Sequence, residues 1–421
     1  MQLPEAFLDR MRHELGPEGF RAYLCAMDEP PKRSGRVNTL RITPEAFALL
    51  TGRAVTDGAF FPEEGFTPGT DLFHAAGVYY MQESSARYPV SLFTLEEGMC
   101  VLDLCAAPGG KSGQLAARMH NTGLLVSNEL VPNRAKILES NLERLGVTNA
   151  VITNMDAESL VKKAGPVFDA VLVDAPCAGE GMFRKDADAV RDWSEAHVLS
   201  CANRQRKLLL TAAAAVKPGG ELVYSTCSFS PAENRETVRY FLGERTDFTL
   251  ISEKTLYPHT SDGEGQYAAL LKREGERSST VLEPLKTKRC PAWESFLPAI
   301  ASLPAGAVQA LPDGRVMLIP PLPRPDFTDG WRIVRAGLLL GEEQKGRLTP
   351  AHALAMAAAP VLKNTVALTK EEAHRYMRGE TLPTQAEGWC AVTYEGYALG
   401  LGKGAAGILK NHLPKGLRLR S

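Results

Sequence analysis

Two hydrophobic periodicities alternate through the middle of this chain. From residue 100 to about residue 273, short apolar runs alternate with segments in which apolar residues recur at helical spacing. The runs that we predict as strands are 100–104, 124–128, 150–154, 168–173 and 221–225. Long helices are predicted over 132–146 and about 196–216, the second ended by Lys-Pro-Gly-Gly at 217–220. This order is typical of an α/β fold with a doubly wound, mostly parallel, Rossmann-like sheet.

The flanking segments have mixed patterns. Helices are predicted over 4–15 and 18–27, a strand over 36–41, and a helix that begins at Thr43-Pro44. In the last third we predict strands at 316–319 and 331–334, a helix opened by a Thr369–Glu372 capping box and ended at Gly379, and a hairpin over 390–400 that turns at Glu395-Gly396. The predicted domains are therefore a small α+β module (1–75), the core (76–275), a polar linker (276–290) and a C-terminal α+β region (291–421).

Length and composition narrow the class of protein. The chain has 421 residues, enough for roughly three domains, and its 44% hydrophobic content argues against extensive disorder. A net charge of −1 provides no global attraction to nucleic acid, so such binding would need a local basic surface. Eight dispersed cysteines indicate reduced thiols, and we predict no metal site. No apolar run approaches the ~20 residues of a membrane span. We expect a soluble, cytoplasmic monomer.

The turn after the first core strand has the character of a ligand site. Residues 99–113 read MCVLDLCAAPGGKSG, an apolar strand followed by small residues and the start of a helix. Ala106, Ala107, Gly109 and Gly110 would let a ligand approach backbone N–H groups and the positive end of the helix dipole. We therefore predict a binding turn, although a tight strand-to-helix turn without a ligand is an alternative.

The phosphate-binding motifs do not fit this turn. A P-loop requires glycine where Cys105 stands, and the G-x-G-x-x-G dinucleotide fingerprint is absent. A nucleoside ligand without a pyrophosphate remains, and S-adenosylmethionine is such a ligand. Glu129, at the end of the second strand, could accept both ribose hydroxyls, and Asp156, after the third, could accept the adenine amino group. Arg134 lies in the first turn of the following helix, where a cation needs a partner.

Two thiols follow neighbouring strands. The fourth strand leads into Asp174-Ala-Pro-Cys-Ala-Gly-Glu-Gly181, and the fifth into Thr226-Cys-Ser228. Because ligands lie beyond the carboxyl ends of parallel strands, Cys177 and Cys227 should face one another across the same site. Each cysteine alone is better explained as a small buried residue. Two at adjacent strand ends beside an acid favour chemistry.

A thiolate that attacks carbon 6 of a cytosine makes carbon 5 nucleophilic enough to take a methyl group from a sulfonium donor. The carbon-5 proton must then leave and the thiol be expelled, which gives a second acid or base group a use. Asp174 is placed to stabilise charge on the ring.

These motifs resemble those of the Nop/Sun family of RNA cytosine-C5 methyltransferases. The similarity covers Asp103–Lys111, Asp174–Gly181 and Ser225–Ser228, and extends to Arg36–Leu40 and Tyr80–Ser85. Residues 400–418 are similar to the RsmF-like bacterial branch, which modifies small-subunit ribosomal RNA. Ser112 stands where threonine is common in this family, and Ala178 where serine is common. The second difference removes only a hydroxyl group beside Cys177.

The resemblance implies a role for each site residue. Cys227 would be the nucleophile, Cys177 would assist product release, and Asp174 would contact both the methionine end of the cofactor and the target base. The cofactor-binding residues would be Cys105, Ala106, Ala107, Pro108, Gly109, Gly110, Lys111, Glu129, Arg134, Asp156 and Asp174. The C-terminal region would be a PUA-like RNA-binding domain.

The end of the chain carries an independent charge signal. After Glu395 there is no acidic residue, whereas Lys403, Lys410, Lys415, Arg418 and Arg420 all fall there. We predict phosphate contacts for the first four, with a solvated tail as the alternative. The predicted activity is thus cytosine-C5 methylation of ribosomal RNA. Transfer RNA as substrate, methylation of a nitrogen, and a non-catalytic RNA-binding assembly factor are the alternatives.

Overall fold

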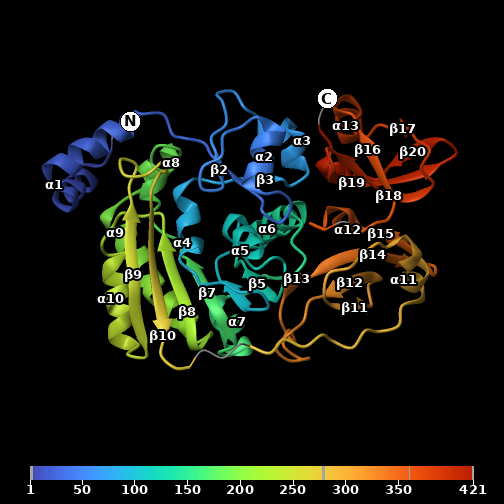
Figure 1. Cartoon of the computed structure of the whole chain (residues 1–421). Helices are drawn as coiled ribbons and strands as arrows, with labels where there is room; N and C mark the ends of the chain where they lie inside the picture. Colours follow the sequence, from blue (N-terminus) through green and yellow to red (C-terminus); the bar gives the residue numbers. More distant parts are fainter. Residues whose placement is uncertain (1–2, 277–279, 360, 420–421) are drawn as a thin grey trace.

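The computed structural model describes residues 3–276, 280–359 and 361–419 (Figure 1). Residues 277–279 of the predicted linker and Arg420 of the basic tail lie outside these ranges. None of the helices in the described ranges combines the length and the apolar character needed to cross a bilayer.

An eight-stranded sheet forms the core, in the order β13-β6-β5-β4-β7-β8-β10-β9. The strands are β4 (Cys100–Asp103), β5 (Leu124–Asn128), β6 (Ala150–Thr153), β7 (Phe168–Asp174), β8 (Val216–Thr226), β9 (Phe248–Leu256), β10 (Gln266–Arg273) and β13 (Ile333–Ala336). Strands β4 to β8 pair in parallel, and β9, β10 and β13 pair antiparallel. The predicted α/β, Rossmann-like fold is confirmed.

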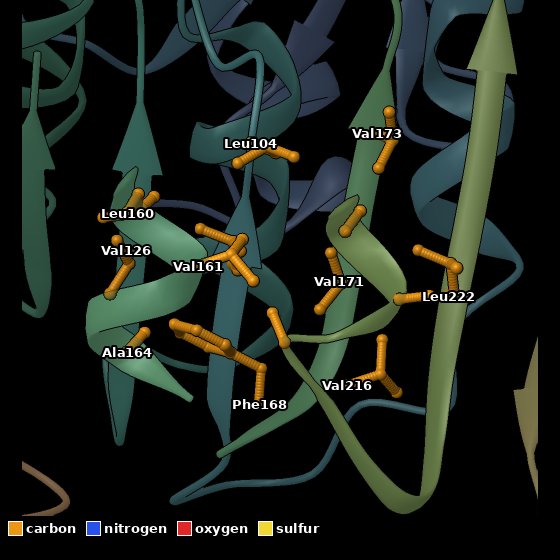
Figure 2. Close-up of a cluster of buried hydrophobic side chains, with 14 of the residues drawn as sticks. Leu104, Val126, Leu160, Val161, Ala164, Phe168, Val171, Val173, Val216 and Leu222 are labelled. Carbon is orange, nitrogen blue, oxygen red and sulfur yellow. The ribbon is translucent and has the colours of Figure 1, made fainter. Parts of the chain in front are cut away.

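Helices cover both faces of this sheet, as in other doubly wound folds. On one face α7 (Ala157–Ala164), α9 (Glu195–Ala213) and α10 (Arg235–Glu244) bury their apolar residues against the strands. Figure 2 shows Leu160 and Val161 of α7 gathered with the strand residues Val126 and Val171. On the other face lie α4 (Tyr88–Ser91), α5 (Gly110–Arg118) and α6 (Pro132–Leu145). The carboxyl ends of the parallel strands remain free of these layers.

Strand β8 begins earlier than its sequence predicts. The helix before it ends at Ala213, and the predicted helix-ending sequence 217–220 lies inside the strand, which starts at Val216. A register shift between Phe168 and Ala170 of β7 accommodates the extra residues. Lys217, which would be exposed in a turn, is instead buried in an ion pair with Asp169 of β7.

The N-terminal segment forms a small α+β module. Helix α1 (Glu5–Asp28) bends at Gly16, where the two predicted helices meet. Strands β1 (Gly35–Val37), β2 (Ala59–Phe60) and β3 (Tyr79–Met81) make an antiparallel sheet, so the module's sheet extends past residue 75. The strand predicted over 36–41 is shorter, since Asn38 turns away to donate to the Gly77 and Leu145 carbonyls. Helices α2 (Pro44–Thr51), capped by Thr43 as predicted, and α3 (Leu72–Ala75) complete the module.

The C-terminal region contains two sheets. One has the order β11-β12-β14-β15 and the other β16-β18-β19-β20-β17. Their strands are β11 (Ala307–Ala310), β12 (Arg315–Ile319), β14 (Leu338–Gln344), β15 (Arg347–Pro350), β16 (Thr365–Leu368), β17 (Leu382–Pro383), β18 (Gly388–Tyr394), β19 (Tyr397–Ala405) and β20 (Ile408–Asn411). The helices of this region are α11 (Pro291–Phe296), α12 (His352–Met356) and α13 (Lys370–Met377). Helix α8 (Ala187–Asp192) belongs to the core. The predicted capping box at Thr369 and the hairpin turn at Glu395-Gly396 are both present.

The C-terminal region packs against both the core and the N-terminal module. Strand β13, which starts two residues later than the strand predicted over 331–334 and overlaps its second half, completes the edge of the core sheet beside β6. The five-stranded sheet shares a hydrophobic cluster with the N-terminal module, in which Phe73 packs on Tyr394 with ring centroids 5.4 Å apart. The three parts therefore pack against one another.

Candidate active site

The turn between β4 and α5 is shaped for close approach to its backbone. The Ala106 N–H donates to the Asn128 carbonyl at 2.8 Å, which ties the turn to the end of β5. Gly109 has φ +110° directly before the helix, a conformation that disfavours any side chain. At Gly110, an added Cβ would lie 3.0 Å from the Tyr80 ring. Backbone conformation thus favours glycine at position 109, and the space beside Tyr80 favours it at position 110.

Asp103 ends β4 beneath this turn. Its Oδ2 accepts a hydrogen bond from the Ser112 hydroxyl at 2.7 Å. Its Oδ1 is buried and accepts no hydrogen bond from any described side chain. Burial, and to a smaller extent the nearby charge of Asp174, raise the pKa of Asp103 to about 7, although the Ser112 hydrogen bond lowers it. A buried carboxylate oxygen without a side-chain donor suits a ligand that brings an ammonium or sulfonium charge, as S-adenosylmethionine does.

Glu129 and Arg134 lie beside the same turn. Glu129 is buried at the end of β5, and its carboxylate accepts the Val131 N–H at 2.9 Å. Arg134 approaches this carboxylate at 3.4 Å and donates to the Ala107 carbonyl at 3.0 Å. Arg134 thus has the partner that its place at a helix N-terminus requires.

Asp156 has a structural role in addition to the cofactor contact predicted for it. It is the exposed N-cap of α7, and its Oδ1 accepts the Ser159 N–H at 2.8 Å. That hydrogen bond lowers the pKa of Asp156 and leaves Oδ2 without a capping role. Its acceptance of an adenine amino group stays a prediction.

The two thiols lie together beyond the ends of β7 and β8. The sulfur atoms of Cys177 and Cys227 are 3.0 Å apart, although the residues are 50 positions apart in the chain. The hydrogen bond with Cys227 and burial raise the pKa of Cys177 well above its ordinary value. The pKa of Cys105, in the binding turn, is also raised, in this case by burial and by the charges of nearby acids. The predicted juxtaposition of the two strand-end thiols is therefore observed.

Asp174, the last residue of β7, is held by three side chains. Its Oδ2 accepts from Lys111 Nζ at 2.8 Å, and its Oδ1 accepts from Ser225 at 2.7 Å and Gln266 at 3.3 Å. Burial lowers the pKa of Lys111, but Asp174 outweighs this and raises it. The ion pair thus links the binding turn to the end of β7, where the loop of Cys177 begins.

Two buried carboxylates fix the loops that carry the cysteines. Glu180 accepts hydrogen bonds from Trp193 Nε1 at 2.8 Å and the Phe229 N–H at 2.9 Å, and it pairs with Arg10 of α1. Glu233 accepts from the Ala178 N–H at 3.0 Å and from the Ser228 hydroxyl at 2.6 Å. Each carboxylate therefore bridges the loop of Cys177 and the loop of Cys227.

Several of these residues are absent from the sequence-based prediction. Asp103 carries a sequence signal, because it is an acid within an apolar strand that leads directly into the small-residue turn. Glu180 stands within the motif Asp174–Gly181. Glu233, Gln266 and Asn128, whose amide donates to the Leu104 and Met155 carbonyls, carry none, since their partners come from distant segments.

The predicted RNA-binding residues lie on the five-stranded sheet and its C-terminal extension. Lys403 and Lys410 are exposed and directly opposite one another on β19 and β20. Lys415 is exposed in a short 3-10 helix. Arg418 is half-buried and donates to the Leu413 carbonyl at 3.2 Å, so part of its guanidinium serves the fold. Across the described ranges, no group of three or more potential ligands forms a metal site.

Four family descriptions match successive parts of the chain. They are the N-terminal domain of 16S rRNA methyltransferase RsmF (3–84), 16S rRNA methyltransferase RsmB/F (90–273), the RsmF rRNA methyltransferase first C-terminal domain (302–357) and the methyltransferase RsmF PUA domain (363–419). The chain is 33% identical to ribosomal RNA small subunit methyltransferase F of Shewanella oneidensis, over 99% of this chain and 97% of the relative. It belongs to this family. The Vibrio vulnificus relative of the same name is 34% identical over 99% of this chain and 97% of its own.

Solved structures agree at the level of the core. A methyltransferase homolog from Pyrococcus horikoshii is 27% identical, with a TM-score of 0.54 over 64% of this chain and all of that chain. NSun6 from the same organism, solved with SFG, has a TM-score of 0.57 at 19% identity over 65% of this chain and 99% of its own, which shows a shared fold. The family confirms the predicted RNA methyltransferase class, its S-adenosylmethionine cofactor and the PUA-like C-terminal domain.

Proposed function

We propose that the protein methylates carbon 5 of a cytosine in small-subunit ribosomal RNA through a covalent adduct with Cys227. The observation that carries the proposal is the pair of sulfur atoms 3.0 Å apart at adjacent strand ends. Methylation of a nitrogen needs no thiol, and a non-catalytic assembly factor needs neither thiol. Both alternatives leave this pair without a use.

Cys227 is the nucleophile in this proposal. The hydrogen bond with Cys227 and burial raise the pKa of Cys177 well above its ordinary value, which disfavours Cys177 as the attacking thiolate. The Cys227 thiolate attacks carbon 6, forming an S–C6 bond and making carbon 5 nucleophilic. S-adenosylmethionine supplies an electrophilic methyl group, held by the turn 105–111, Glu129 and Arg134.

The later steps use Cys177 and Asp174. After methyl transfer the carbon-5 proton leaves to solvent, the S–C6 bond breaks, and its electrons return to the Cys227 sulfur. Cys177 stabilises this departing thiolate by donating its S–H. Asp174, which is oriented by its ion pair with Lys111, can accept a hydrogen bond from the exocyclic amine of the cytosine.

The test is methylation of isolated RNA followed by nucleoside analysis. Incubated with S-adenosylmethionine and small-subunit RNA or subunits, the wild type should produce 5-methylcytidine, identified by mass spectrometry, and Cys227→Ala should produce none. Transfer RNA serves as the competing substrate. Methylation of transfer RNA alone would replace the proposed substrate, and a methylated nitrogen would contradict the chemistry.

A separate test concerns the cofactor residues. Glu129→Ala removes a buried acceptor, so S-adenosylmethionine binding, measured by calorimetry, should weaken by ~1 to 3 kcal/mol. RNA affinity should be unchanged. Asp192→Ala, in an exposed acid of α8, is the matched control. Unchanged cofactor affinity in Glu129→Ala would place the ligand elsewhere.

A further inference from the structure

Three neighbouring strands of the C-terminal sheet bring one aromatic and two basic residues into line. Trp389 of β18 lies opposite Lys403 of β19, and Lys403 lies opposite Lys410 of β20. Directly paired residues project from the same face of a sheet. The three side chains therefore form a continuous row. We call this row, together with His412, the Trp389 platform.

Ring contacts hold this platform together. Lys403 Nζ lies 5.3 Å from the centre of the Trp389 ring, a cation–π distance. The His412 ring meets Trp389 edge-on, with centroids 4.4 Å apart. Partial burial, with Lys403 and Lys410 nearby, lowers the pKa of His412. At neutral pH His412 is therefore an aromatic neighbour, and the two lysines carry the charge.

The platform is the uncovered part of a sheet face that is elsewhere packed. Ala391 and Leu401, two pairs further along β18 and β19 and so on the same face, are buried in the hydrophobic cluster of the four-stranded sheet and α12. Lys403 and Lys410 are exposed at the surface, as is His412, and Trp389 is half-buried. Figure 1 places these strands at the outer end of the molecule, away from β9 and β10. The sequence from residue 396 onward contains no acid to neutralise the lysines.

We propose that the Trp389 platform binds an unpaired nucleotide of the RNA, with the base stacked on Trp389 and the flanking phosphates on Lys403 and Lys410. This inference rests on the proposed RNA substrate and adds which form of RNA the C-terminal domain selects. An aromatic surface flanked by cations is the combination that binds single strands, because every base offers a flat face and every linkage a charge. An acidic peptide would use the lysines and leave the indole without a role.

The experiment measures binding of the full chain to labelled RNA by fluorescence anisotropy, without methyl donor. Trp389→Ala should weaken binding of a single-stranded uridine hexamer roughly 5- to 100-fold, with an unchanged salt dependence. Trp389→Phe, which keeps a stacking ring, should restore most of the affinity. The double variant Lys403→Gln/Lys410→Gln should weaken binding and reduce the log–log salt slope by about 0.7 for each phosphate that is no longer neutralised. Lys207→Gln, in an exposed lysine of α9, is the control and should change nothing.

The specificity arm uses a blunt RNA duplex and a polyglutamate peptide. Trp389→Ala should not alter duplex binding, because paired bases are not free to stack. Equal loss for the hexamer and the duplex, or retained hexamer affinity in Trp389→Ala, would overturn the proposal. So would polyglutamate binding that depends on Trp389, which would indicate a protein partner. Since no step needs catalysis, failure of the methylation assay and failure of the platform are distinguishable.

Discussion

At the residue scale, the most perturbed acid of the binding turn is Asp103, which lies beneath it. Asp103 is buried, its Oδ1 accepts no hydrogen bond from a described side chain, and burial raises its pKa to about 7. The folded state therefore holds a proton that the unfolded chain, with an ordinary aspartate pKa near 4, releases. This proton stabilises the fold at low pH, and that contribution is lost as the pH rises from about 4 to about 7.

Asp103→Asn should remove this pH dependence. The free energy of unfolding of the variant relative to wild type should increase by up to about 1.4 kcal/mol per pH unit between pH 5 and pH 7, and level off above pH 7. Denaturant melts at pH 5, 6, 7 and 8 measure the difference. Asp188→Asn, in an exposed acid of α8, is the control. A stability difference that is the same at every pH would show that Asp103 is already ionised.

At the scale of elements, helix α1 supports the loops of both cysteines. Arg10 pairs with buried Glu180, which itself bridges the two loops, and Glu14 receives a bidentate hydrogen bond from Arg235 at 2.6 and 2.8 Å. In Figure 1 the helix lies beside the end of the core sheet that carries α8. The N-terminal helix is thus a support for the site, a role that its amphipathic pattern alone did not reveal.

Arg10→Ala should therefore slow the chemistry while Arg12→Ala does not. Loss of the charged partner of Glu180 should destabilise the protein by about 2 kcal/mol and lower the rate of 5-methylcytidine formation, with cofactor affinity unchanged. Arg12 lies on the same helix, but its side chain is 57% exposed and contacts nearby Asp9 and the Phe20 ring of the same helix, so its removal should cost about 1 kcal/mol or less. Equal effects of both variants on the rate would remove α1 from the positioning of the site.

The sequence predicted the elements whose signals are local. The parallel strands, the Thr43 and Thr369 helix starts and the Glu395-Gly396 hairpin follow from apolar runs, caps and turn residues that lie within a few positions of one another. The thiol pair was also predictable, because parallel strands deliver their ends to one edge. The placement of β13 in the core sheet, the buried Lys217–Asp169 pair and the Glu180 and Glu233 bridges depend on contacts between distant segments, which periodicity does not record.

At the scale of the whole molecule, the N-terminal module and the C-terminal sheet share one hydrophobic cluster. Phe73 of the module packs on Tyr394 and Tyr397 of the hairpin, with ring centroids 5.4 and 6.5 Å apart. Such a joint core couples the stability of two segments more than 300 residues apart in the chain. Because the five-stranded sheet packs on the N-terminal module, the position of the Trp389 platform relative to that module is fixed.

Phe73→Ala should loosen both segments together. Hydrogen exchange, followed by mass spectrometry, should increase in β3 and in β19, because the cavity left by the ring is shared. Phe61→Ala, in a phenylalanine that is 44% exposed, should leave exchange in β19 unchanged. Faster exchange confined to the N-terminal module would mean that the two segments are stabilised independently.

In the proposed mechanism, Cys227 attacks the base and Cys177 assists its release. The most direct measurement is the covalent protein–RNA complex, resolved on denaturing gels and located by mass spectrometry. With RNA that carries 5-fluorocytosine at the target, the methylated adduct cannot lose its carbon-5 substituent, so wild type should be trapped on Cys227. Cys227→Ala should form no complex, and Cys177→Ala should accumulate one on ordinary RNA because release is impaired. A complex that persists in Cys227→Ala and disappears in Cys177→Ala would reverse the assignment and contradict the account.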